Sequence, residues 1–122
     1  MDETTQRHDD CPVDRLLNQI SGPWTTYILW LLGQNAVLRF GELRAAMPGI
    51  SPKVLTERLR RLEGDGLVSR EQRPTIPPQV YYRLTARGAE LRTILDDIGA
   101  TALRWAAEDE ARAGVAAQSL KA

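Results

Sequence analysis

Apolar residues recur at helical spacing along most of the chain, and they alternate with polar residues only in one stretch after residue 66. The pattern predicts a first helix over residues 13–20, with apolar positions three and four apart. A second predicted helix, 24–32, ends at Gly33 and is apolar on nearly every side, so it should be the most buried helix. Between them, Ser21 is the expected cap and Pro23 fits a first helical position.

The next segment predicts two further helices in close succession. Residues 38–39 allow a very short strand, and the pattern over 40–47 predicts a third helix that is ended by proline and glycine. The fourth helix, 51–64, begins with Ser51 as its cap and Pro52 in its first turn. Its inward face is set by leucines at i, i+4 and i+7, which are Leu55, Leu59 and Leu62. Two glycines around Asp65 end it.

The period then changes from 3.6 to 2, which predicts a β-hairpin over residues 67–84. The two strand segments are separated by a proline-rich tip, with Arg73 and Gln79 on either side of it. Thr85 is expected to cap a last helix, running to about residue 113. Spacings of four and three along that helix form a seam suited to packing on another helix. The seam consists of Leu91, Leu95, Ile98, Ala102 and Trp105.

This order of elements, with a tight helix–turn–helix followed by a hairpin, is that of a winged helix. The predicted class is therefore α+β, mainly α: a winged helix-turn-helix with N- and C-terminal dimerisation helices. We expect a disordered acidic tail at 1–10, the winged domain at 11–113 and a flexible tail at 114–122. In such domains the second helix of the turn, here 51–64, enters the major groove, and the hairpin 67–84 acts as the wing.

The charge distribution favours an anionic partner, although the 122-residue chain has no net charge. Residues 39–92 hold eleven basic and six acidic side chains, a difference of +5. One cysteine and one histidine, His8 in the tail, leave no metal-ligand spacing and no catalytic set, so no cofactor and no enzyme activity are expected. No apolar run is long enough to span a membrane, and the acidic N-terminus is no signal peptide. We therefore expect a cytoplasmic protein.

The candidate DNA-binding residues lie on the outward face of helix 51–64 and at the hairpin tip. Lysine and arginine can neutralise phosphate or bind guanine, and serine or threonine can contact phosphate. The candidates are Arg39, Ser51, Pro52, Lys53, Thr56, Arg60, Arg61, Arg73 and Gln79. The alternative interpretations are a solvated helix face, with Glu57 paired to Arg60 or Arg61, and an ordinary hairpin turn.

Several motifs with intact spacing over residues 11–105 carry a family resemblance. They include "CPVDRLL", "RFGELRAAMPGIS", "LTERLRRLEGDGLVSR" and "PPQVYYRLTARG". Together these motifs resemble the HxlR-type transcriptional regulators, which are relatives of the MarR winged-helix group. The resemblance implies homodimers, built on the first and last helices, that bind pseudo-palindromic operators on double-stranded DNA. It adds Leu16 and Leu17 to the expected dimer interface. Pro23 departs from the family pattern, which has lysine or arginine there.

Cys11 is the candidate redox sensor, because some members of the resembled family sense oxidants or electrophiles through a cysteine before proline. A helix N-terminus lowers the pKa of a thiol, whereas the neighbouring aspartates oppose that effect, and a packed, inert cysteine is the alternative. The tryptophans could also line a cavity for a small apolar effector. Two interpretations of function other than a simple repressor therefore stay open: a ligand- or oxidant-responsive switch, and a winged helix used only for protein–protein contact.

Overall fold

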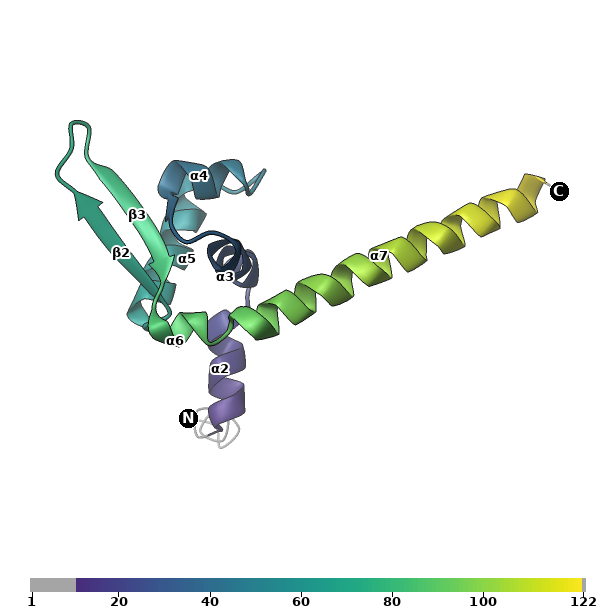
Figure 1. The fold of residues 1–122 in the computed structure, drawn as a ribbon, viewed down its shortest axis with the longest axis horizontal. Helices are drawn as coiled ribbons and strands as arrows, with labels where there is room; N and C mark the ends of the chain where they lie inside the picture. The colour runs from purple at the N-terminus through teal and green to yellow at the C-terminus, as the bar shows by residue number, and fades with distance from the viewer. Residues whose placement is uncertain (1–10, 122) are drawn as a thin grey trace. The chain divides into compact units, whose positions relative to one another are not determined.

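The computed structural model describes residues 11–121, and the prediction of a disordered tail at 1–10 lies outside them. The chain forms two compact units, with the boundary between Arg92 and Thr93. The first unit contains α2 (Pro12–Ile20), α3 (Thr25–Gln34), β1 (Leu38–Arg39), α4 (Phe40–Ala45), α5 (Pro52–Gly64), β2 (Val68–Arg73), β3 (Gln79–Leu84) and α6 (Ala86–Ala89). The helix α7 (Arg92–Lys121), apart from its first residue, belongs to the second unit (Figure 1). This order confirms the predicted α+β class.

The three strands form an antiparallel sheet in the order β1–β3–β2. In the hairpin, Val68 pairs with Leu84 at the base and Arg73 pairs with Gln79 at the tip. The short strand β1 pairs with the outer side of β3, where Leu38 lies opposite Tyr82. The hairpin that the alternating pattern predicted is therefore confirmed, and the structure adds that β1 anchors it on one side. Figure 1 shows it reaching beyond α3, α4 and α5 of the first unit.

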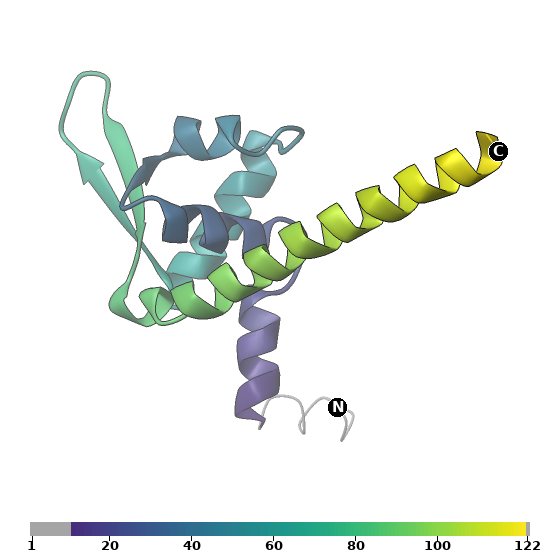
Figure 2. The ribbon, with the colours of Figure 1, turned by 45° about the vertical axis from the view of Figure 1, so that its right-hand side comes forward.

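The core of the first unit is built from the inward faces of α3, α4 and α5, which lie beside the sheet in Figure 2. Ile28 and Leu29 of α3 are fully buried, as the apolar character of that helix predicted. Leu43 of α4 and Met47 just after it are also fully buried. The three leucines predicted to face inward from α5, Leu55, Leu59 and Leu62, are at most 1% exposed. Their burial fixes which face of α5 remains outside.

Both ends of α5 follow from local sequence. The Ser51 hydroxyl accepts a hydrogen bond from the backbone N–H of Val54 at 3.1 Å, and Pro52 occupies the first turn. The helix ends at Gly64, and Gly66 adopts a φ of +77°, a conformation that glycine enters without steric cost. The predicted start, cap and end of this helix are confirmed.

The connection between α2 and α3 differs from the sequence prediction. The Ser21 hydroxyl donates to the carbonyl oxygen of Asn18 instead of capping α3, which begins at Thr25. Trp24 takes the N-cap position with a φ of +74°, so neither Ser21 nor Pro23 starts the helix. The helix also continues through Gly33 to Gln34, because a single glycine inside a helix is tolerated when the surrounding residues pack well.

The predicted continuous helix after Thr85 is broken into α6 and α7. Thr85 caps α6 as expected, since its hydroxyl accepts from the N–H of Gly88 at 3.0 Å. The chain then tightens: the N–H groups of Glu90 and Leu91 bond to carbonyls three residues back, which ends α6. Gly88 of α6 is buried against the backbone of Leu67, so this short helix packs closely on the start of the hairpin.

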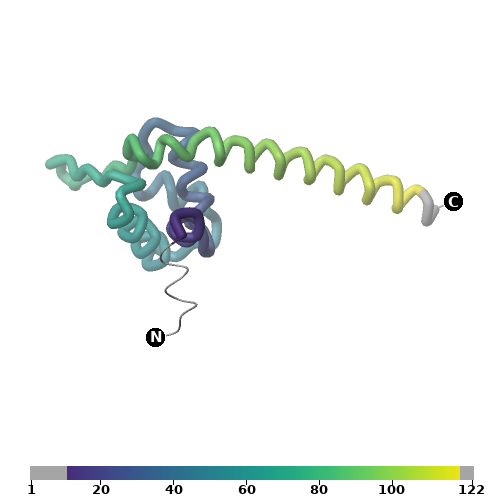
Figure 3. The backbone as a smooth tube through the Cα atoms, turned by 90° about the horizontal axis from the view of Figure 1, so that it is seen from below, coloured from purple at the N-terminus to yellow at the C-terminus, as the bar shows by residue number. Residues whose placement is uncertain are grey.

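The helix α7 continues unbroken to Lys121, past the end predicted near residue 113 (Figure 3). Its last part is rich in alanine, a strong helix former that outweighs the single Gly114. No helix among the described residues has the length and apolar character needed to cross a membrane.

Candidate nucleic-acid interface

The outward face of α5 presents the side chains that the sequence assigned to DNA. Lys53 and Arg60 are exposed, and Thr56 is half-buried on the same side. This placement follows from the leucines on the opposite face, because residues spaced by three and four share one side of a helix. Ser51 is exposed at the start of α5, where its hydroxyl is engaged as the helix cap.

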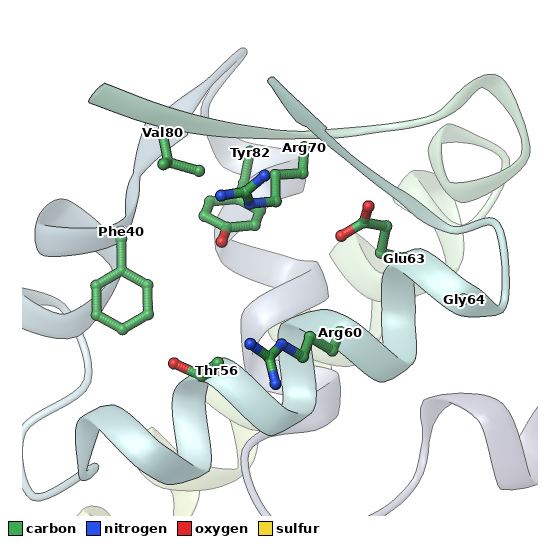
Figure 4. A pocket seen from close by; sticks show the side chains of 8 residues that line it. All are labelled: Phe40, Thr56, Arg60, Glu63, Gly64, Arg70, Val80 and Tyr82. Atoms are coloured by element: carbon green, nitrogen blue, oxygen red, sulfur yellow. The ribbon is translucent and has the colours of Figure 1, made fainter. Parts of the chain in front are cut away.

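A cleft of about 800 Å³ lies between α5 and the sheet, and Figure 4 shows its lining side chains. Thr56 and Arg60 enter it from α5, whereas Arg70 enters it from β2. The ring of Tyr82, which is paired with Arg70 across the hairpin, forms part of the wall. The full lining is Phe40, Thr56, Arg60, Glu63, Gly64, Arg70, Val80 and Tyr82. The cleft thus joins the outward face of α5 to the base of the wing.

Arg70 was not among the residues predicted from sequence. The signal was available, since Arg70 is two residues after the buried Val68 and therefore lies on the same side of the strand. No ion pair joins Lys53, Arg60 or Arg70 to an acid in the part of the chain that the structure describes. Because these three cations form no ion pair among the described residues, they can bind an anion without first breaking a salt bridge.

The tip of the wing is ordered by contacts around Arg73. Its guanidinium lies over the ring of Tyr81, 4.1 Å from the ring centre, in a cation–π contact. Its Nε is 3.7 Å from the Glu71 carboxylate, which also meets Arg83 at 3.3 Å. Gln79 accepts a hydrogen bond from the Tyr81 hydroxyl. Arg73 and Gln79 therefore both stand at the tip as predicted, and Glu71 offsets part of the positive charge there.

Arg39 precedes α4 and is held by Glu42. The carboxylate of Glu42 accepts from the backbone N–H of Arg39 at 2.9 Å and from its Nε at 3.1 Å. These bonds, the backbone one foremost, hold the pKa of the Glu42 carboxyl below its ordinary value. Arg39 thus has a local structural partner, and its contact with DNA stays a prediction.

Arg61 lies on the flank of α5 away from the cleft. It donates from a terminal guanidinium nitrogen to the carbonyl oxygen of Asn18 at 2.8 Å. Arg58, one turn earlier, donates from Nε to the carbonyl oxygen of Pro23 at 3.0 Å. The alternative interpretation, in which Glu57 pairs with Arg60 or Arg61, is not supported, since neither ion pair forms among the described residues. A DNA contact by Arg61 stays a prediction.

Cys11 is exposed at the N-cap of α2, where no side-chain hydrogen bond caps the helix. Leu16 of that helix is half-buried and Leu17 is 52% exposed. No group of three or more potential metal ligands gathers anywhere in residues 11–121.

The second unit carries an exposed apolar strip on one side of α7. Ile94 and Ile98 are each 51% exposed and Trp105 is 60% exposed. These side chains, with Asp97, Thr101 and Ala102, outline a shallow hollow of about 470 Å³. Only part of the predicted seam is therefore exposed: Ile98 and Trp105 are open to solvent, whereas Leu91 and Leu95 are buried within the single chain.

Comparison with known proteins identifies one family over most of the chain. Residues 19–110 match the HxlR-like helix-turn-helix family. The uncharacterized HTH-type transcriptional regulator BH0655 of Halalkalibacterium halodurans is 38% identical over 89 residues, which are 73% of this chain and 79% of that protein.

Two solved structures share the fold. A chain from Porphyromonas gingivalis W83, assigned to the MarR family of transcriptional regulators, superposes with a TM-score of 0.71 and 36% identity over 84% of this chain and 94% of that one. The redox regulator HypR in its oxidized form superposes with a TM-score of 0.68 and is 37% identical over 73% of this chain and 91% of that one.

Proposed function

The chain belongs to the HxlR-like helix-turn-helix family of transcriptional regulators, and we propose that it binds a pseudo-palindromic operator as a homodimer and represses transcription. In this proposal α5 enters the major groove, and the β2–β3 hairpin contacts the backbone or minor groove. The proposal includes a cytoplasmic location, as the DNA partner requires, and the winged domain at 11–113 as the regulatory part.

The observation that carries the proposal is the cleft whose two walls hold Arg60 and Arg70. A phosphate group of one DNA strand, passing between the helix and the wing, would meet both guanidinium groups. Lys53 and Thr56, on the same side of α5, are then the candidates for contacts to base edges or to the next phosphate. Ser51, Pro52, Arg39, Arg61, Arg73 and Gln79 complete the proposed contact set.

A dimer is proposed through α7 and α2. Exposed apolar side chains are stabilised when a partner covers them, and Ile98, Ala102 and Trp105 offer such a strip on α7. Leu17 adds an exposed apolar side chain on α2. A two-fold dimer would present two copies of α5 to half-sites about one turn of DNA apart, or a multiple of it.

The test is a gel-shift with the DNA upstream of the chain's own gene, repeated at increasing salt concentration. We expect a discrete complex whose log affinity falls linearly with log salt, by about 0.9 for each phosphate neutralised. Binding that is indifferent to salt would reject an interface built on these cations. A chain that binds no DNA at all would favour a winged helix used only for protein–protein contact.

A redox-responsive switch is a second candidate, favoured by the exposed thiol of Cys11 at the start of α2. HypR, which shares the fold, is itself a redox regulator. With one cysteine in each chain, a reversible disulfide must form between protomers or with a small thiol. We expect diamide to release DNA from the native chain and not from Cys11→Ser. Equal release from both would show that Cys11 is not the sensor. A small effector is tested by the same release assay with candidate ligands.

A further inference from the structure

Two arginines tie the helix α5 to the α2–α3 connection. The DNA-binding proposal gives Arg58 no role, and it counts Arg61 among the DNA contacts, a role for which the bond described here offers an alternative. Arg58 donates to the carbonyl oxygen of Pro23 and Arg61 to that of Asn18, at 3.0 and 2.8 Å. The two donors are three residues apart, so they rise from one flank of the helix. The two bonds link residues that are 35 and 43 positions apart in the sequence, and they join α5 to the α2–α3 connection and to the end of α2.

The two acceptors occupy places where a positive donor is well matched. Asn18 is in the last turn of α2, where carbonyl groups have no partner within the helix and carry the negative end of its dipole. Pro23 lies in a connection with an unusual backbone, because Gly22 has a φ of +106° and Trp24 a φ of +74°. The Asn18 oxygen also accepts a hydrogen bond from the Ser21 hydroxyl at 3.3 Å, so Arg61 is its second donor and brings a positive charge to the end of the helix.

A third bond keeps this connection compact. The Thr26 hydroxyl donates to the carbonyl oxygen of Ile20 at 2.5 Å, which draws the start of α3 to the end of α2. The residues between 18 and 26 are thus fixed from α3 on one side and from α5 on the other. A displacement of α2 would have to move α5 with it or break the bond between Arg61 and Asn18, and the Arg58 bond holds the adjoining connection to the same helix.

We propose that Arg58 and Arg61 are positioning residues that couple the orientation of α5 to that of α2. This inference rests on the proposed function, because it assigns to α5 the DNA contact whose geometry the two bonds set. It gives these two arginines a role distinct from that of Lys53 and Arg60, although all four lie on one helix. It also supplies a physical route by which a change at α2 alters DNA binding.

The first experiment measures the coupling without DNA, by hydrogen–deuterium exchange of the full chain. In Arg58→Gln, Arg61→Gln and the double variant, amides of residues 18–26 should exchange several-fold faster, because the connection opens locally. Exchange in β2 and β3 should stay unchanged, which separates local opening from general loss of stability. Arg60→Gln is the matched control on the same helix and should leave residues 18–26 protected. The single variants serve if the double variant does not fold, and unchanged exchange in them would overturn the proposal.

The second experiment measures operator affinity at several salt concentrations. In the variants, α5 should be correctly placed in only a fraction of the molecules. The apparent affinity for the operator falls in proportion to that fraction, and we expect a loss of about 3- to 10-fold. The slope against log salt should stay that of the native chain, because no phosphate contact is lost. A slope reduced by about one in Arg61→Gln would make Arg61 a phosphate contact and overturn its positioning role. Failure of the proposed function would look different, since the native chain itself would then bind no DNA.

Discussion

Gly88 of α6 lies so close to Leu67 that a Cβ at position 88 would stand less than 3.0 Å from the Leu67 carbonyl oxygen. The same oxygen accepts the backbone N–H of Thr85 at 3.0 Å, so its position is fixed. The contact places the start of α6 directly on the first residues of the wing. The orientation of the wing therefore depends on a glycine outside it.

Gly88→Ala is expected to lower the free energy of unfolding by about 1–3 kcal/mol, because the new methyl group meets backbone that cannot rotate away. Denaturant unfolding measures this change through the midpoint at constant slope. Gly41→Ala is the matched control, since nothing lies within 4 Å of a Cβ built there. It should be neutral or stabilising by up to about 1 kcal/mol. Equal effects of the two changes would contradict the close contact.

Glu71→Gln is expected to strengthen DNA binding, because the carboxylate now offsets Arg73 and Arg83 on the wing. All three side chains are about half exposed, so the pairs themselves contribute little to stability. We expect a gain in affinity of about 2- to 5-fold at low salt, diminishing as salt screens the charges. Titration of labelled operator DNA measures it, and unchanged affinity would place the wing tip away from the phosphates.

Ile98→Arg is expected to prevent dimerisation without unfolding the chain, because Ile98 is half-exposed on the apolar strip of α7. Leu95, which the sequence would also have suggested, is 2% exposed, and a charge there would disrupt folding instead. Light scattering at micromolar concentration measures the mass. Ala100→Arg is the control, as Ala100 is exposed but does not line the hollow. A native chain that is already monomeric would contradict the proposed dimer.

Arg60→Ala should weaken operator binding by about 1–3 kcal/mol and relax sequence preference if Arg60 contacts a base. Affinity for a panel of operators with single substitutions separates this case from a phosphate contact, which would weaken binding equally on all sequences. Lys53→Ala provides the comparison on the same face. Normal binding by both variants would show that another helix enters the groove.

Most of the fold could be predicted from the sequence pattern, because each helix or strand is determined mainly by residues that are close together in the sequence. The leucines at 55, 59 and 62 and the cap at Ser51 determine the position and facing of α5 from a few neighbouring residues. The hairpin could be found in the same way from its alternation and its prolines. The same reasoning located Lys53, Thr56 and Arg60 on the outward face.

The features that sequence could not give depend on contacts between distant segments. The bonds of Arg58 and Arg61 to the α2–α3 connection require the tertiary fold. From the sequence alone Arg61 is a candidate DNA contact and Arg58 has no assigned role. The close approach of Gly88 to Leu67 also joins distant segments, and no helical pattern contains it. The place of Arg70 in the cleft depends on how the hairpin packs against α5, a contact between segments that the alternating pattern of the strand does not contain.

The central claim, that two copies of α5 enter the major groove of one operator, is tested most directly by footprinting. Genomic fragments bound by the native chain would be selected, and protection mapped along a fragment with the native chain and with Arg60→Ala. We predict two protected half-sites in inverted orientation, with centres about one DNA turn apart or a multiple of it, both weakened together by Arg60→Ala. A single protected half-site, or protection unaffected by Arg60→Ala, would contradict the account.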